Sequence, residues 1–284
     1  MPIDAAKAVA ADPRTAEIAW GHKDIQLYHL GLGAGVPATD PDELRYTLES
    51  KLHVLPSFAT VAGAGMAMMG GLAAPGIDVN LAHVLHGGQT VELHRPIPVE
   101  GSARTTARVA AVYDKTKAAV VVLRTEVADA DGPLWASDAS IFIRGEGGFG
   151  GERGPSDRLQ VPDRAPDRTV DRPIREDQAL LYRLSGDWNP LHADPEFAKL
   201  GGFDKPILHG LCSYGMTLKA VVDTALDGDV SRITRYSTRF AGVVYPGETL
   251  RVRMWQEPGR VQVTVVAVER DEAPVLADTV VEHS

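Results

Sequence analysis

Hydrophobic and polar residues alternate in four consecutive stretches near the end of the chain, and this period of two predicts β-strands. The stretches span residues 231–244, 249–256, 261–269 and 274–281. They follow His209–Leu226, a run of 18 residues that is apolar or small on almost every side. A helix without a polar face must be surrounded by protein. This order therefore predicts an antiparallel sheet curled around one buried helix, an α+β arrangement.

Two shorter helices are predicted just before the buried one. Residues 176–184 show helical spacing that stops at Gly186. Residues 194–196, with the sequence Asp-Pro-Glu, combine an N-cap, a first-turn proline and a first-turn acid. They predict a short helix that ends at Gly201.

The first half of the chain repeats this coarse order. Ser57–Leu72, rich in Gly, Ala and Met, is predicted to be its buried helix, and four strands are predicted at residues 86–93, 102–113, 118–128 and 133–144. Short similarities also recur at nearly constant offsets, since Leu27–Leu30 resembles Leu181–Leu184 at an offset of 154 residues. We interpret the halves as diverged copies of one unit, the alternative being a chance similarity of short segments.

A change of composition separates the two halves. A glycine-rich tract, residues 145–154, is followed by a segment rich in Pro, Asp and Arg with few apolar residues. Such a segment buries too little apolar surface to offset its ordering entropy. The prediction is an N-terminal repeat at residues 1–150, a linker at 151–175 and a C-terminal repeat at 176–284.

Composition and charge narrow the class of protein. The length of 284 residues suits two domains, and 29 basic against 38 acidic residues give a net charge of −9. This argues against a nucleic-acid or membrane partner. The single cysteine, Cys212, excludes an internal disulfide and a multi-thiolate metal site, and it is expected to be a small core residue. With neither a membrane-span pattern nor a signal-peptide pattern, we expect a cytoplasmic protein.

The densest group of polar residues lies in a predicted loop before the buried helix. Asp187 and His192 stand five residues apart, and Pro190 forces Asn189 out of the helical region. A carboxylate and an imidazole on one rigid loop suit the positioning of a water molecule and proton transfer. The alternative is structural, with Asp187 capping a turn and His192 satisfying a backbone carbonyl.

A second group lies at the start of the buried helix. Free N–H groups at a helix N-terminus favour negative charge, and Gly210 allows a substrate oxygen to approach the backbone closely. Helix capping with close packing is the structural alternative. The first half has Gly33, Ala38 and Thr60 at the positions equivalent to Asp187, His192 and Gly210, so the polar set occurs once on a scaffold that occurs twice. This favours a functional role.

These residues resemble a known family. The string from Tyr182 to His192, followed by His209-Gly210-Leu211-Cys212, is similar to MaoC-like hydratases, in particular R-specific 2-enoyl-CoA hydratase (hydratase 2), the hydratase unit of the peroxisomal multifunctional enzyme. Family-like stretches in the first half include Leu27–Ala34, Val54–Phe58 and Arg144–Gly151. The resemblance implies a double hot-dog fold, in which two repeats join side by side into one sheet.

The resemblance also implies roles for individual residues. Asp187 and His192 would hold and activate the water, Asn189 would orient the loop or the water, and the Gly210 N–H would bind the thioester carbonyl oxygen. Substrate-binding positions would fall on His86, Gly87, Lys115, Trp188, Pro190, Leu191 and Phe240. Lys115 would meet a phosphate of CoA, or it is a solvated turn lysine. Gly88 departs from the family, whose members commonly have an acid at this place.

The implied activity is the reversible hydration of a trans-2-enoyl-CoA to the (3R)-3-hydroxyacyl-CoA in fatty acid metabolism, with no cofactor and no metal. The expected partners are an acyl-CoA thioester and a second copy of the chain in a homodimer. Two alternatives stay open. One is a (3R)-hydroxyacyl thioester dehydratase of fatty-acid synthesis that acts on carrier-protein thioesters, and the other is a non-catalytic acyl-CoA-binding module.

Two further patterns carry less weight. Gly145, Gly147 and Gly150 satisfy a GxGxxG dinucleotide pattern, but a Pro/Arg/Asp segment follows in place of a helix, so a phosphate would have no helix N-terminus to bind. The Met-rich stretch of residues 62–69 is interpreted as close helix packing or, alternatively, as the wall of an acyl tunnel.

Overall fold

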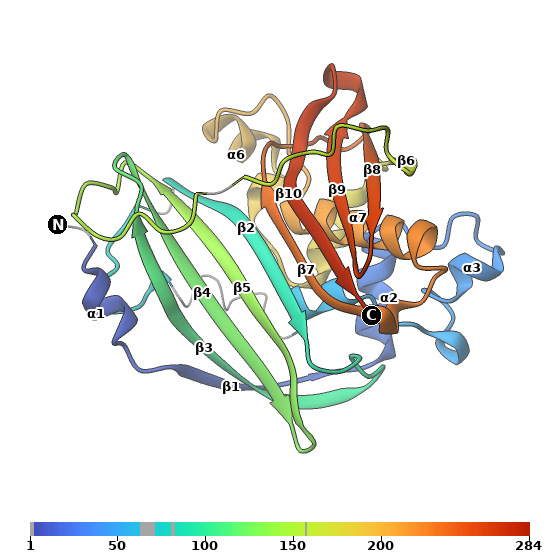
Figure 1. Cartoon of the computed structure of the whole chain (residues 1–284), viewed down its shortest axis with the longest axis horizontal. Coiled ribbons are helices and arrows are strands. Elements are labelled where there is room, and N and C mark those ends of the chain that lie inside the picture. The colour runs from blue at the N-terminus through green and yellow to red at the C-terminus, as the bar shows by residue number, and fades with distance from the viewer. Residues whose placement is uncertain (1–2, 63–71, 81–82, 157) are drawn as a thin grey trace.

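Ten strands form one continuous antiparallel sheet in the computed structural model, which describes residues 3–62, 72–80, 83–156 and 158–284 (Figure 1). The strand order is β1-β3-β4-β5-β2-β7-β10-β9-β8-β6. The strands are β1 (Arg14–Trp20), β2 (Val84–Leu93), β3 (Gly101–Asp114), β4 (Ala118–Asp129), β5 (Gly132–Arg144), β6 (Arg168–Pro173), β7 (Ile233–Phe240), β8 (Thr249–Glu257), β9 (Arg260–Ala267) and β10 (Ala273–His283).

The strand order confirms the predicted repeat. Outward from the central β2–β7 pair, the first half runs β2, β5, β4, β3, β1 and the second half runs β7, β10, β9, β8, β6. Each half therefore uses its second, fifth, fourth, third and first strand in the same order. The two halves join where residues 88–92 of β2 pair with residues 235–239 of β7, which makes one sheet of two repeats. The α+β double hot-dog prediction is confirmed.

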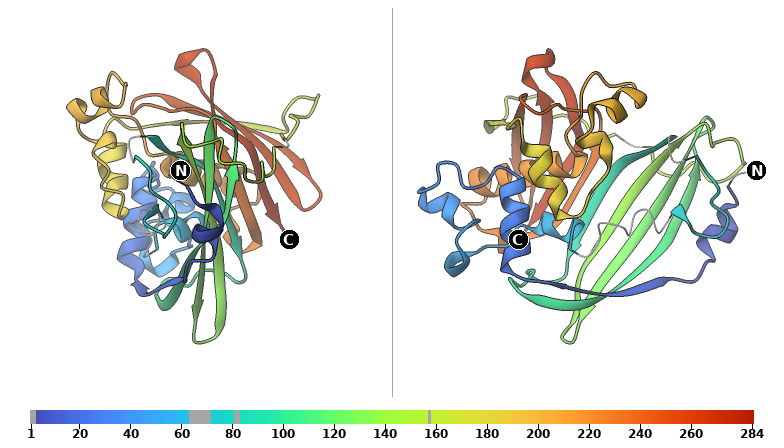
Figure 2. Two further views of the ribbon diagram at one scale, coloured as in Figure 1. Left: turned by 90° about the vertical axis from the view of Figure 1, so that its left-hand side faces the viewer. Right: turned by 180° about the vertical axis from the view of Figure 1, so that it is seen from behind.

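The predicted buried helix of the second half is α7 (Gly210–Ala225), and its residues 212–222 are all buried. One side of α7 contacts the second-half strands, and the other is covered by residues of the first half (Figure 2). Close packing explains Gly215, because a Cβ atom there would lie 2.7 Å from the hydroxyl of Tyr28 and 2.6 Å from Leu32. Among the described residues, no helix has both the length and the apolar character to cross a membrane.

Helices of the first half hold α7 from its outer side. The segments that contact α7 are α2 (His22–Gly31), α3 (Pro41–Leu44) and the 3₁₀ turn η2 (Pro56–Thr60); the 3₁₀ turn η1 (Glu49–Lys51) lies exposed between α3 and η2 in the sequence. Lys219 of α7 is almost buried and pairs with Glu43 at 2.7 Å and with Asp223 at 2.8 Å. The Tyr46 hydroxyl donates to Asp223 at 2.7 Å. Buried charges need such partners, so this network fixes the first half against α7.

The first half differs from the second in the helical segments that pack against its strands. Of the predicted helix Ser57–Leu72, the residues up to Thr60 form part of η2, and residues 63–71 lie outside the described part. The short helix α1 (Ala5–Val9) contacts β3 and contributes Ala8 to a second, smaller core against β3, β4 and β5. The molecule thus has one large core, centred on α7, and one small core in the first half.

The remaining helical segments of the second half follow the predictions closely. Residues 176–184 contain α5 (Gln178–Tyr182) and the start of η4 (Arg183–Ser185). Asp194 caps α6 (Pro195–Leu200), since its carboxylate accepts from the N–H groups of Glu196 and Phe197. The 3₁₀ turns are η5 (Pro190–His192), η6 (Val230–Arg232) and η7 (Val268–Arg270).

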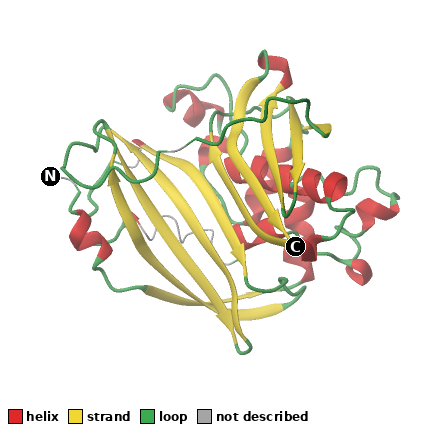
Figure 3. Cartoon of the chain, in the orientation of Figure 1, coloured by secondary structure: helices red, strands yellow, loops and turns green. Residues whose placement is uncertain are grey.

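Two strands were not predicted. Both β1 and β6 lie at the edges of the sheet, pair on one side only and are mostly exposed, so the apolar alternation that indicates a strand is weak. Strand β6 lies within residues 151–175 and pairs with β8. The described residues of 151–167 form neither helix nor strand and run as a loop toward β6 (Figure 3). The division into two domains and a linker stays a prediction.

The glycine-rich tract after β5 closes the β3–β4 turn. The carboxylate of Asp114 accepts hydrogen bonds from the N–H groups of Thr116, Gly148 and Gly150 at 2.7–2.8 Å, and these bonds lower its pKa. Gly147 packs closely, because a Cβ atom would lie 2.6 Å from the backbone nitrogen of Ala118. The amides that a dinucleotide phosphate would need are therefore already bound.

Candidate active site

The loop of residues 186–192 is held rigid by its own side chains. Gly186 adopts φ 120°, a conformation that glycine tolerates best. The Asp187 carboxylate accepts from the Asn189 N–H at 3.1 Å, and the Asn189 side chain accepts from the Leu191 N–H at 3.0 Å. Asn189 lies outside the helical region, as predicted, whereas Pro190–His192 form the 3₁₀ turn η5, and the Asp187 and Asn189 side chains are each bound at one oxygen.

His192 is buried and fixed by one hydrogen bond. Its Nδ1 lies 2.9 Å from the carbonyl oxygen of Ile207. Because a carbonyl only accepts, Nδ1 carries the proton and Nε2 keeps its lone pair. Burial lowers the pKa of His192 below its ordinary value, against the opposing effects of the Ile207 carbonyl and the Asp187 charge. His192 is therefore a neutral imidazole, tied to the segment that leads into α7.

Asp187, His192 and His209 come together in one cluster. A carboxylate oxygen and one ring nitrogen of each histidine all lie within 4.8 Å of one another. A water molecule that makes two hydrogen bonds of normal length spans about 4.6 Å between its partners. The separation of Asp187 and His192 therefore suits a shared water molecule.

The same three side chains are ligand types for a transition metal, although no metal-ligand spacing is visible in the sequence. The rings of His192 and His209 are stacked, with centroids 3.8 Å apart and planes 29° apart. Ring nitrogens bind metals in the plane of the ring, and nearly parallel rings direct their lone pairs side by side. This arrangement does not suit both histidines binding one ion.

Gly210 is the first residue of α7, and its N–H has no acceptor within the helix. The helix dipole adds to the attraction of this amide for a negatively charged oxygen. Gly210 is exposed, and a Cβ atom there would lie 3.1 Å from the ring of Phe240. The absence of a side chain keeps the amide accessible beside this ring.

The first half contributes His86 to the site. The ring of His86 on β2 packs against Phe240 on β7, with centroids 4.8 Å apart. The bulge at Gly87 interrupts the β2–β5 register next to His86. Burial lowers the pKa of His86 to about 4, and the negative charge of Asp187 acts in the opposite direction. The β2–β7 junction therefore brings both repeats to one site.

Of the other predicted substrate-binding residues, three lie in the same loop as Asp187 and His192, and one lies in a distant turn. Trp188 is 56% exposed, with the Arg183 guanidinium 4.9 Å from its ring centroid, and Pro190 is exposed beside it. Leu191 is half-buried in the same loop. Lys115 lies in the β3–β4 turn, and β4 and β5 separate β3 from β2. Its Nζ donates to the carbonyl of Pro155 at 2.9 Å, so the structure does not bring Lys115 to the cluster.

Two residues of the site were assigned no role from the sequence. His209 stacks on His192 and also packs against Tyr182, with ring centroids 4.9 Å apart. Tyr182 in turn lies 6.0 Å from Tyr28, and both hydroxyls are buried without a partner among the described residues. His209 and Tyr182 both belong to the sequence motifs that resemble the family. Only the fold shows that their rings pack against each other.

Cys212 is the third residue of α7 and is buried. Its thiol donates to the Gly31 carbonyl at 3.4 Å, and burial raises its pKa well above the ordinary value. The interpretation as a core residue is confirmed, because a nucleophile requires an accessible thiolate.

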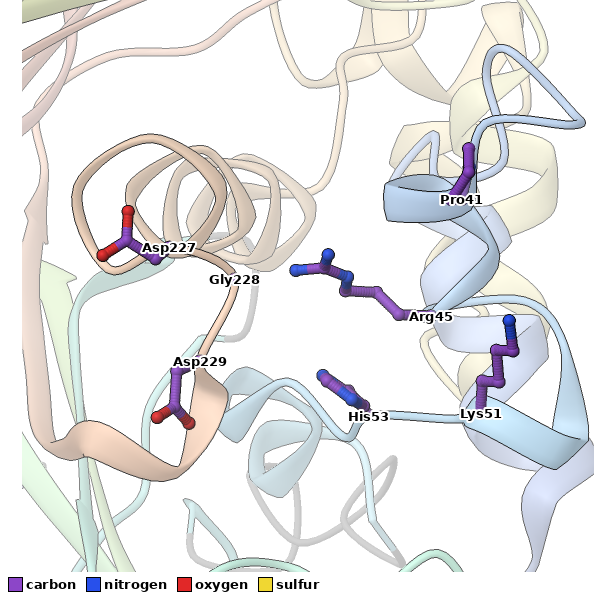
Figure 4. A pocket seen from close by; sticks show the side chains of 7 residues that line it. All are labelled: Pro41, Arg45, Lys51, His53, Asp227, Gly228 and Asp229. Carbon is purple, nitrogen blue, oxygen red and sulfur yellow. The ribbon is translucent and has the colours of Figure 1, made fainter.

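One hollow on the described surface lies away from this cluster (Figure 4). It has a volume of about 480 Å³ and opens near the C-terminal end of α7, about 24 Å along the helix from Gly210. Its lining residues are Pro41, Arg45, Lys51, His53, Asp227, Gly228 and Asp229. A smaller hollow of about 110 Å³ reaches Leu184 and Ser185, just before the loop, and includes Trp20 and Phe58 of the first half.

The lowered pKa of His192 predicts the acid side of the pH profile. If neutral His192 is the active form, kcat/KM is expected to stay level from about pH 8 to about pH 6.5 and to fall only at lower pH, since the depressed pKa keeps the ring neutral down to more acidic conditions. Steady-state rates across this range would check it, with folding monitored in parallel. A decline centred above about pH 6.5 would contradict the assignment.

Substitution of Gly210 by Ala is expected to lower kcat by about tenfold or more, since its methyl group would press on Phe240 and crowd the amide. Gly21→Ala is the matched control, because a Cβ atom at Gly21 meets nothing within 4 Å. Rates for the two variants, compared at equal folded fraction, would test the role of the amide. Equal rates for both would show that the Gly210 amide is not used.

Comparison with known proteins assigns each half of the chain to a family model. The model of the MaoC like domain matches residues 157–274, and that of the MFE-2 hydratase 2 N-terminal domain matches residues 19–145. Enoyl-CoA hydratase ChsH3 of Mycobacterium tuberculosis is 50% identical over 98% of this chain and 98% of its own length. The 3-hydroxyacyl-thioester dehydratase Y of the same organism is 42% identical over 91% of each chain.

A solved structure agrees over the same length. The crystal structure of a MaoC-like dehydratase from Phytophthora capsici matches with a TM-score of 0.89 at 31% identity and covers 99% of this chain and 98% of that one. The similarity therefore extends over both repeats and the junction between them.

Proposed function

The chain belongs to the family of MaoC-like enoyl-CoA hydratases, and from this premise we propose that it catalyses the reversible hydration of a trans-2-enoyl-CoA to the (3R)-3-hydroxyacyl-CoA in fatty acid metabolism. The observation that carries the proposal is the convergence of Asp187, His192 and the first amide of α7 at one place in the fold. The names of its relatives support the same reaction class.

The first step is polarisation of the thioester. Its carbonyl oxygen accepts a hydrogen bond from the Gly210 N–H, and negative charge that develops on this oxygen is stabilised by the amide and the helix dipole. Withdrawal of electrons through the conjugated double bond makes C3 electrophilic. The enzyme thereby stabilises the enolate-like transition state more than the substrate.

The second step is addition of water. A water molecule between the Asp187 carboxylate and the bare Nε2 of His192 gives its hydroxyl to C3, and the proton it loses passes through this pair to C2. The π bond between C2 and C3 and one O–H bond of water are broken, one C–O and one C–H bond are formed, and both catalytic side chains return to their starting charge. Because one water serves both carbons from one face, the addition is syn.

The first repeat supplies part of the binding surface in this proposal. His86 of the first repeat packs against Phe240 of the second, whose ring lies beside Gly210, and both rings would contact the thioester end of the substrate. The rim of the loop, with Trp188 and Pro190, would contact the CoA portion. A contact between Lys115 and a CoA phosphate stays a prediction.

The direct test is an assay with a trans-2-enoyl-CoA. We expect the ultraviolet absorbance of the enoyl thioester to fall with time and the product to be the (3R)-3-hydroxyacyl-CoA, identified by a stereospecific dehydrogenase. A (3S) product or an unchanged absorbance across chain lengths would overturn the proposal.

A second candidate is the dehydration of a (3R)-hydroxyacyl thioester carried on a carrier protein in fatty-acid synthesis. It is favoured by the relative named 3-hydroxyacyl-thioester dehydratase Y. The same residues would run the reaction in reverse, so the carrier decides between them. A higher kcat/KM for carrier-protein thioesters than for CoA thioesters would favour this candidate, whereas binding without turnover would indicate an acyl-CoA-binding module.

Two finer points belong to this proposal. We expect the protein to act in the cytoplasm and two copies of the chain to form a homodimer. Light scattering coupled to size-exclusion chromatography would measure the mass in solution, and a mass near 30.4 kDa would contradict the dimer.

A further inference from the structure

We propose that His209 is a positioning residue of this reaction. It fixes the positions of Asp187 and His192 relative to the amide of Gly210. The inference rests on the proposed hydration and deepens it. His209 would not touch the reacting atoms. Its ring would set the relative placement of the three groups that do.

The first contact is with the acid. Nε2 of His209 lies 3.2 Å from the main-chain carbonyl oxygen of Asp187. Since a carbonyl only accepts, Nε2 carries the proton and donates it. The carboxylate of Asp187 itself accepts only from the Asn189 N–H, within the same loop, among the hydrogen bonds of the described residues. The bond from His209 is therefore the one that ties Asp187 to α7.

The second and third contacts involve the base and the amide. The His209 ring stacks on the His192 ring at 3.8 Å between centroids, which limits tilting of the base. His209 is also the N-cap residue of α7 and is bonded covalently to Gly210. One residue thus connects the acid and the base, through its ring, to the amide donor, through its main chain.

The site of His209 is unfavourable for a residue that only fills space. The side chain is 1% exposed, and its Nδ1 is buried without a partner among the described residues. Burial is the main reason that the pKa of His209 falls to about 2, and the neighbouring His192 lowers it further. An apolar residue could occupy this volume without an unsatisfied nitrogen. The buried imidazole is therefore better explained by the bond that its other nitrogen makes.

The test compares three variants whose side chains separate the hydrogen bond from packing. His209→Gln keeps an N–H donor near the position of Nε2 but loses the ring. His209→Phe keeps the ring but loses the donor, and His209→Leu loses both. Each variant is assayed for kcat and KM with a trans-2-enoyl-CoA, and its melting temperature is measured.

A positioning role predicts a specific order. We expect kcat to fall by about 10²-fold in the Phe and Leu variants with KM changed little, because a small displacement of a catalytic group has an effect of this size on the chemical step. The Gln variant is expected to recover most of this loss. The Phe variant is expected to melt at or above the temperature of the wild type, since it removes a buried unsatisfied nitrogen.

The matched control is His29→Gln in the first repeat. His29 is also fully buried and also has its Nδ1 on a backbone carbonyl, that of Tyr46, at 2.9 Å. It lies outside the cluster, so its substitution is expected to lower stability and leave kcat of the folded protein unchanged.

The opposite order would overturn the inference. If the Phe variant keeps kcat and the Gln variant loses it, or if neither the Phe nor the Leu variant folds, His209 is a packing residue. Failure of the proposed function is a separate result, because wild-type protein would then show no hydration. An active wild type with unchanged kcat in all three variants would reject the positioning role alone.

Discussion

Asp187→Asn is expected to lower kcat for hydration by about 10²- to 10⁴-fold while the fold persists. The amide cannot take a proton from the bound water or return one, although it has nearly the same shape. Asp187 is partly exposed in a surface loop, so its loss leaves the core intact. Steady-state kinetics with crotonyl-CoA and decenoyl-CoA would measure the effect, and circular dichroism would confirm the fold.

The matched control for this variant is Asp194→Asn. Asp194 lies in the following segment and caps α6 through hydrogen bonds to Glu196 and Phe197, a role that Asn also fills well. We expect the control to retain wild-type kcat. If Asp187→Asn hydrates either substrate at a rate close to that of the wild type, the acid–base role of Asp187 is wrong.

His192→Ala is expected to lower kcat to a similar extent, about 10²- to 10⁴-fold, because the water loses its second contact and its proton acceptor. The Asp187→Asn/His192→Ala double variant should be hardly slower than either single variant. Residues that act on the same water as a unit show such strongly non-additive effects. The three rates form a double-mutant cycle, measured on protein of verified fold.

His29→Ala is the comparison for loss of a buried imidazole. His29 bonds the Tyr46 carbonyl and accepts from the Leu55 N–H at 3.3 Å, so its loss should reduce the melting temperature. The kcat of the folded fraction should not change. Multiplicative rate losses in the double-mutant cycle would show that Asp187 and His192 act on different steps, which contradicts a shared water molecule.

The periodic elements could be predicted because their information is local. Alternation marked the four strands β7 to β10 of the second half, and the unbroken apolar run marked α7; the repeat of the same coarse order then located β2 to β5 in the first half. Strands β1 and β6 were not predicted. An edge strand has one paired neighbour and mostly exposed side chains, so apolar and polar residues need not alternate along it. For these two, pairing with β3 and β8 decides the conformation.

In the candidate site, too, the features encoded by neighbouring residues could be predicted, and those that depend on distant segments could not. Asp187, Asn189 and His192 lie within one loop, and the turn residues around them indicated a polar loop before any fold was known. By contrast, Lys115 was assigned to a CoA phosphate by resemblance alone, a contact that stays a prediction, and only the fold shows that it lies in the β3–β4 turn with two strands between β3 and β2. Position along the chain says little about which strands separate two residues.

The sequence by itself determined the order of α7 and of the eight inner strands, the duplication, and the placement of a carboxylate and an imidazole on one loop before a buried helix. These features depend on residues a few positions apart, whose preferences act through backbone conformation and periodic burial. Only the tertiary structure decided that β2 pairs with β7, that His86 thereby reaches Phe240, and that His209 stacks on His192 and bonds to Asp187. Such contacts join residues brought together by packing around α7, and the free energy that selects them comes from the whole core and not from any one segment.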